Sequence, residues 1–153
     1  MGIKKKEAIA WFEGEDKEML MAINSAQSNF PIFLKAMEEE SKRIVPAFED
    51  ALVKYAFPAT KHEVKVEHMF LSEIRFNGNF LSGILVSDPM YTDAVKVGQT
   101  IEIEPSRVSD WLYVINGVGT GGYTFKIIYS RFSEQEKEYY SNEPPFVWIK
   151  NSL

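Results

Sequence analysis

The chain of 153 residues contains no cysteine, and this absence excludes several kinds of chemistry at once. Without cysteine there is no disulfide framework, no thiolate zinc site and no thiol nucleophile. Histidine is scarce as well, with only two residues. A metal centre built from histidine and cysteine is therefore disfavoured, and we expect neither a metal nor another cofactor.

The sequence also lacks an excess of positive charge. Its 17 Lys and Arg residues stand against 22 Asp and Glu residues, which gives a formal net charge of −5. Nucleic-acid binding depends on cationic side chains that replace phosphate counterions, so no nucleic-acid partner is expected. An unknown protein or a small molecule stays open as partner, and so does the choice between monomer and homodimer.

Long apolar runs are missing too. No run approaches the roughly 18 residues of a membrane-spanning helix, so no membrane partner is expected. The N-terminal "MGIKKKEAIAWF" is charged but has no apolar core of the kind found in secretory signals. These absences predict a cytoplasmic protein.

The first third of the chain has helical periodicity. Asp16 is placed to cap a helix whose apolar positions recur every three or four residues, at Met19, Ile23, Ala26 and Phe30. Pro31 suits the first turn of a second helix. We expect the inner face of this second helix to carry Phe33, Leu34, Met37 and Ile44. Residues 51–57 fit either a helix or a strand by periodicity alone.

The remainder reads as strands. Residues 62–70 alternate, which predicts a half-buried strand with His62, Val64, Val66, His68 and Phe70 on one side and Glu63, Lys65, Glu67 and Met69 on the other. Asn77-Gly78 predicts a hairpin, and Gly83 indicates close packing inside the next strand. Alternation over 110–115 and 122–129 predicts two more strands, joined by a glycine-rich connection.

The last segment predicts a short helix, with Ser133 and Glu136 as a capping box, followed by an edge strand or extended tail over 144–151. Together these elements predict an α+β fold. We expect N-terminal helices packed on a strongly bent antiparallel sheet, or partial barrel, of five to six strands, with a short C-terminal helix.

Five segments occur in an order that resembles the YegJ-like family of bacterial domains of unknown function. They are "EHMFLSEI", "GILVSDP", "VKVGQTIEI", "SDWLYV" and "GGYTFKI". The resemblance covers roughly residues 16–129, and it favours a strand over Ala51–Phe57. Phe70 stands where the family usually has Trp, and Gln99 where it usually has Asp. We expect a single domain over 1–153, with a family-like core (16–129), an N-terminal tail (1–15) and a C-terminal helix and extended tail (130–153).

Few residues are candidates for chemistry. His68 suits proton transfer near neutral pH, but a buried, hydrogen-bonded structural histidine is the favoured interpretation. Asp110 could orient His68, or accept backbone N–H groups in a turn. A Ser–His–Asp set would need Ser109, which lacks the Gly-x-Ser-x-Gly elbow of such nucleophiles. We assign no catalytic residue.

Aromatic and glycine residues beside Asp110 complete the candidate site. Trp111 and Tyr113 share a strand face and either line a groove or pack in the core. Gly121 and Gly122 would form its rim. A phosphate cradle is disfavoured there, because such a cradle needs a helix after the glycines and the sequence predicts a strand.

The sequence therefore predicts a non-enzymatic binding or protein-interaction module. One alternative is a small enzyme or small-ligand binder with a pocket near His68 and Trp111. Another is an immunity-type protein that neutralises a toxin, because an acidic surface suits a basic partner.

Overall fold

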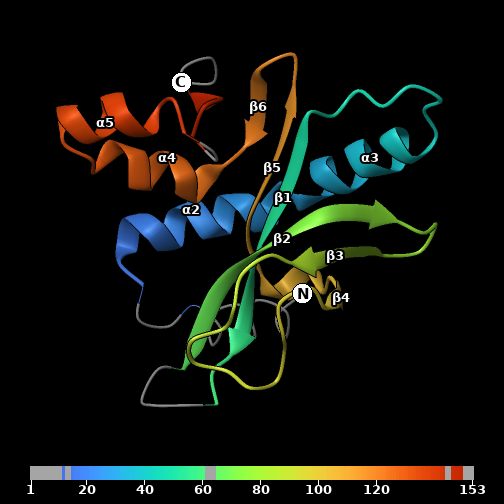
Figure 1. Ribbon diagram of the computed structural model, residues 1–153, viewed down its shortest axis with the longest axis horizontal. Coiled ribbons are helices and arrows are strands. Elements are labelled where there is room, and N and C mark those ends of the chain that lie inside the picture. Colours follow the sequence, from blue (N-terminus) through green and yellow to red (C-terminus); the bar gives the residue numbers. More distant parts are fainter. Residues whose placement is uncertain (1–11, 13–14, 61–64, 144–145, 150–153) are drawn as a thin grey trace.

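The computed structural model describes residues 12, 15–60, 65–143 and 146–149. Its centre is a sheet of six strands in the order β4-β3-β2-β1-β5-β6, in which every neighbouring pair is antiparallel. The strands are β1 (Asp50–Pro58), β2 (Val66–Phe76), β3 (Leu81–Leu85), β4 (Thr100–Glu102), β5 (Val108–Ile115) and β6 (Val118–Gly121), as Figure 1 shows. The predicted strand over Ala51–Phe57 is confirmed as β1.

Irregular pairing bends this sheet. The register shifts between Lys54 and Tyr55 where β1 meets β5, and between Ser72 and Arg75 where β2 meets β3. Glu73 inside the second shift has a positive φ of 48°. Such bulges kink a strand and increase its twist, so the sheet curls but stays open. The predicted α+β fold with a bent antiparallel sheet is confirmed.

Two tight features of the sheet also match the sequence. Asn77-Gly78 forms the β2–β3 hairpin, with Gly78 at φ 101°. A Cβ on Gly83 would lie 2.8 Å from the side chain of Ile74 on the neighbouring strand. The close packing expected at Gly83 is therefore present.

The N-terminal helices are α2 (Lys17–Ser28) and α3 (Phe30–Ser41). Asp16 caps α2 by accepting a hydrogen bond from the Met19 amide at 2.8 Å, as predicted. The predicted inner face of α3 is partly wrong. Phe33 and Met37 are buried, but Leu34 is 36% exposed and Ile44 is 99% exposed. The helix ends at Ser41, so Ile44 lies beyond it.

Helices cover both faces of the sheet, which explains why the half-buried pattern predicted around residue 69 is wrong. Met69 is 4% exposed and packs in a cluster with α3, whereas its neighbour Phe70 packs on the opposite face beside α4. Residues 66–72 of β2 are therefore all buried or half-buried, and only Glu73 and Arg75 of this strand are exposed. Residues 61–64, including His62, lie outside the described part of the chain.

Residues after the glycine-rich connection form a helix, α4 (Tyr123–Ser130), and the strand predicted there is wrong. Alternating aromatic residues gave the appearance of a strand. The residues that pack inward are instead spaced three or four apart, at Phe125, Ile128, Tyr129 and Phe132. This is the spacing of one helix face. In Figure 1, α4 lies beside α2, to the left of β1 and β5.

The C-terminal part ends in α5 (Glu134–Tyr140), whose Ser133–Glu136 capping box is formed as predicted. The edge strand or extended tail expected next is not found among the described residues, because 146–149 form turns. Trp148 is 3% exposed and Ile149 is fully buried. This segment therefore belongs to the core that α4 forms with the sheet.

Candidate functional site

Four polar residues meet on the α4-facing side of the sheet, and we call them the polar cluster: Lys54, His68, Ser109 and Asp110. Lys54 on β1 pairs with Asp110 on β5, and His68 on β2 pairs with Ala56 on β1. At the register shift in the β1–β5 pairing, Ser109 has no residue paired opposite it on β1. The bulge therefore turns both Ser109 and Asp110 towards the elements that pack on this face.

Asp110 is fully buried, and its carboxylate holds the N-terminus of α4. Oδ1 accepts from the Tyr123 amide at 3.0 Å and from the Trp111 amide at 2.8 Å. Oδ2 accepts from the Thr124 amide at 2.7 Å, from the Thr124 hydroxyl at 2.5 Å and from the Phe125 amide at 3.4 Å. First-turn amides lack partners within a helix, so Asp110 satisfies them from another strand.

This capping decides what the glycine-rich connection can hold. A helix does follow Gly122, contrary to the sequence prediction, and a helix N-terminus is an ordinary site for an anion. The anion there is the carboxylate of Asp110. Burial raises the pKa of Asp110, while its hydrogen bonds to Thr124 and the charge of Lys54 act in the opposite direction. The place of a phosphate is thus already taken by a side chain.

His68 contacts Ser109 but not as a base that would activate it. The Nδ1 atom of His68 lies 3.2 Å from Ser109 Oγ, which itself donates to the Lys54 carbonyl at 3.2 Å. Because the hydroxyl proton points to that carbonyl, Nδ1 is the donor in the first bond. Asp110 bonds to α4 and not to His68, so the Ser–His–Asp set is not assembled.

Burial and the nearby charge of Lys54 lower the pKa of His68 to about 4. The imidazole is therefore neutral near pH 7, and it lies within the protein with 19% of its side chain exposed. Burial also lowers the pKa of Lys54, against the pull of the carboxylates of Asp110 and Glu15.

Trp111 and Tyr113 lie on the opposite face of β5 from Asp110. Trp111 is 1% exposed, belongs to the cluster that packs on α3, and donates from Nε1 to the Ala26 carbonyl at 2.8 Å. Tyr113 is half-buried and stacks on Phe48 with ring centroids 4.9 Å apart. These two aromatic residues pack in the core and do not share a wall with His68.

The glycines serve close packing. Gly121 has φ +90°, and a Cβ there would lie 2.3 Å from the Trp111 carbonyl oxygen. The Gly122 amide donates to the same oxygen at 2.7 Å. On the other side, a Cβ on Gly119 would lie 2.3 Å from the ring of Trp148. The glycine run therefore leaves space for the side chain of Trp148 from the same chain.

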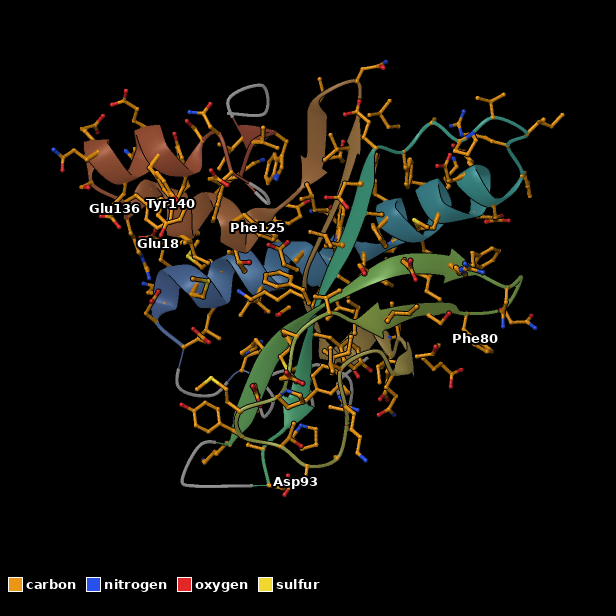
Figure 2. All side chains as sticks on the ribbon, viewed as in Figure 1. Glu18, Phe80, Asp93, Phe125, Glu136 and Tyr140 are labelled. Carbon is orange, nitrogen blue, oxygen red and sulfur yellow. The ribbon has the colours of Figure 1, made fainter. Side chains whose placement is uncertain are left out.

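A groove that sequence reasoning missed lies on α5. Its volume is about 430 Å³, and it is lined by Gln135, Glu138, Tyr139, Asn142 and Glu143. Tyr139 is 63% exposed. Figure 2 shows Glu136 and Tyr140 of the same helix at one end of the molecule, far from Phe80 on the β2–β3 hairpin. The signal in the sequence was the run of glutamates around two adjacent tyrosines.

Two further searches cover the described residues. None of their helices is long and apolar enough to cross a membrane. No group of three or more His, Asp or Glu side chains in the described part of the chain is arranged to hold a metal ion.

These features define a small α+β domain in which buried polar residues of a curled sheet fix the helices on it. The chain belongs to a family described as an uncharacterized protein conserved in bacteria (DUF2314), whose model matches residues 16–146. The resemblance to the YegJ-like family is confirmed. The match extends past residue 129 through α5, so the C-terminal helices are part of the family domain.

Two relatives are similar over most of this chain. A protein of Neisseria meningitidis serogroup B, whose name describes an ankyrin repeat protein, is 28% identical over 130 residues, 84% of this chain. This chain spans 51% of that protein's length. The uncharacterized protein YegJ of Escherichia coli K12 is 25% identical over 126 residues, covering 82% of this chain and 76% of YegJ. No solved structure matches this chain.

Three of the segments that carry the resemblance meet at the polar cluster. They contain His68, the Ser109–Asp110 pair and the Gly121–Thr124 turn. Their hydrogen bonds run between segments, from α4 to Asp110 and from His68 to Ser109. The family pattern therefore corresponds to one connected structural unit in this chain.

Proposed function

We propose that this chain is a non-enzymatic protein-interaction module. The observation that carries the proposal is the full use of the candidate catalytic groups inside the fold. The Asp110 carboxylate accepts hydrogen bonds from α4 and the Ser109 hydroxyl donates to a backbone carbonyl. Groups engaged in this way hold elements together and are not free to attack or deprotonate a substrate.

The α5 groove is the surface we propose for the interaction. Glu138 and Glu143 line it with their carboxylates exposed. Among the described residues, neither of them has an ion-pair partner. The exposed Tyr139 follows Glu138 on α5, and Glu143 lies three residues past the end of the helix. Carboxylates beside an aromatic face favour a cationic side chain, by charge and by cation–π attraction.

The expected partner is a protein segment that carries Lys or Arg. The net charge of −5 would also attract such a partner over distance. The Neisseria relative supports an interaction role in general terms, because ankyrin repeats form extended binding surfaces. The activity of that whole protein, of which this chain spans half the length, is not assumed for this chain.

A double variant that removes two carboxylate charges tests the surface. A fluorescent peptide of alternating Arg and Ser is titrated with the full chain at low salt, and binding is read by anisotropy. We expect Glu138→Gln/Glu143→Gln to weaken binding about tenfold, since two exposed charge pairs contribute about 0.7 kcal/mol each. Tyr139→Ala should weaken it further, by about threefold, through the lost cation–π contact.

Glu39→Gln/Glu102→Gln is the matched control. Glu39 and Glu102 are exposed on α3 and β4, and their substitution changes the net charge by the same amount. We expect this control to bind the peptide like the native chain. If both double variants lose affinity equally, binding reflects overall charge and the α5 groove is not the interaction surface.

A further inference from the structure

Two residues that precede α2 contact His68 of the polar cluster. Phe12 is 2% exposed and stacks on the ring of His68, with centroids 5.6 Å apart and planes 20° apart. Glu15 Oε1 lies 3.6 Å from His68 Nε2. An aromatic ring and a carboxylate, three residues apart, thus lie side by side on His68.

The carboxylate offsets a buried charge. Lys54 is desolvated, and the groups that favour its charged form are Asp110 and Glu15. Asp110 is already occupied by the N-terminus of α4. The charge of Asp110 still acts on Lys54, and a carboxylate in the covering segment adds to it, which offsets more of the cost of burying the ammonium.

The covering residues come from outside the part of the chain that the family model matches. That match begins at Asp16, whereas Lys54, His68 and Ser109 lie inside it. The surface thus lies among the residues that the family model matches, and Phe12 and Glu15 precede them. The chemistry of the cover is defined by what the surface offers, an imidazole face and an ammonium.

We infer that the surface of Lys54, His68 and Ser109 is a docking site for a partner segment with an aromatic residue followed three positions later by a carboxylate, and that Phe12 and Glu15 occupy it in cis. The cis segment competes with such a partner. A tethered competitor acts at an effective concentration of about 1 mM, so it weakens partner binding by its own occupancy. This site is independent of the proposed α5 surface.

The test supplies the chain's own motif in trans. The probe is a synthetic peptide of residues 9–16, IAWFEGED, titrated by calorimetry. The receptor is the full-length Glu15→Lys variant, in which an ammonium faces Lys54 and expels the cis segment. We expect this variant to bind the peptide at least about tenfold more tightly than the native chain does.

Matched variants identify the contacts. Peptides with Phe12→Ala or Glu15→Gln should bind the Glu15→Lys chain at least about tenfold more weakly, through loss of the ring or the charge. Adding Lys54→Met to that chain should have the same effect, since Met keeps the stem and removes the ammonium. The α5 variant Glu138→Gln/Glu143→Gln should leave this binding unchanged, which separates this inference from the proposed function.

Folding of each variant is checked by near-UV circular dichroism. If Glu15→Lys does not fold, the native chain is titrated with excess peptide and the His68 resonances are followed by NMR. A shift is then expected with the native-sequence peptide and not with a peptide that carries both Phe12→Ala and Glu15→Gln. Three results would each overturn the inference. The first is a folded Glu15→Lys chain that does not bind the peptide, and the second is binding that is unchanged by Lys54→Met. The third is the absence of any shift in the His68 resonances of the native chain.

Discussion

Acidification from pH 7 to pH 5 is expected to destabilise the protein through His68. In the folded chain its pKa is lowered to about 4 by burial and by Lys54. In the unfolded chain it titrates near 6.5. Between these two pKa values His68 is protonated in the unfolded state and neutral in the folded state, so falling pH favours unfolding.

The sign and the size follow from linkage. The stability is complete above the unfolded pKa of 6.5 and is lost as pH falls towards 4. Between pH 7 and pH 5 this difference in proton uptake amounts to about 2 kcal/mol, and below pH 4 it reaches about 3 kcal/mol. His68 is mostly buried, so little of this effect is screened by solvent.

The assay compares the native chain with His68→Asn by urea unfolding at pH 7, 6 and 5. Asn keeps a polar atom near the position of Nδ1, which contacts Ser109, and it does not titrate. The variant loses packing against Phe12 and is expected to be less stable at pH 7. The gap between the two proteins should narrow by about 2 kcal/mol at pH 5.

Carboxyl groups titrate in both proteins, so their effect cancels in this difference. A gap that stays constant within about 0.5 kcal/mol would refute the argument. So would an NMR titration in which the His68 ring, assigned by its absence in His68→Asn, changes protonation near pH 6.5 in the folded protein.

Two further predictions concern the Asp110–Gly122 region. Gly121→Ala should lower the free energy of unfolding by about 4 kcal/mol, because its backbone is strained at φ +90° and its Cβ meets the Trp111 carbonyl. Gly78→Ala, at φ +101° with open space around it, should lose only about 1–2 kcal/mol in the same urea unfolding, and equal losses would contradict the packing argument. Asp110→Asn should lower the free energy of unfolding by about 3 kcal/mol and speed hydrogen exchange at the Thr124 amide. The asparagine side chain has one acceptor oxygen, whereas the carboxylate accepts hydrogen bonds at two. Unchanged exchange there would rule out the capping role.

The parts of the fold with local signals could be predicted. The Asp16 cap, the Asn77-Gly78 hairpin and the Ser133 capping box are each specified by neighbouring residues. Residues 51–57 needed the family resemblance, because periodicity alone allowed two answers. Ile44 was placed on a helix face because the sequence gives no clear stop near Ser41.

The error at α4 has a different origin. Aromatic and β-branched residues favour a strand locally, and they alternate from Tyr123 to Tyr129. A second pattern, from Phe125 to Phe132 with helical spacing, was present in the same residues. Its helix is held at the N-terminus by Asp110, thirteen residues before Tyr123, on a strand. Local propensity and periodicity do not reveal that tertiary contact.

At the candidate site, the sequence identified Asp110 as a residue of interest but did not reveal its role. Asp110 was selected because it neighbours Trp111 and could orient His68, whereas its bonds go to the N-terminus of α4. A carboxylate buried at that position removes the free amides that would otherwise attract a phosphate. Its charge also acts on Lys54, its pairing partner on β1. A second carboxylate, that of Glu15, adds to this charge from a position just before the residues that the family model matches.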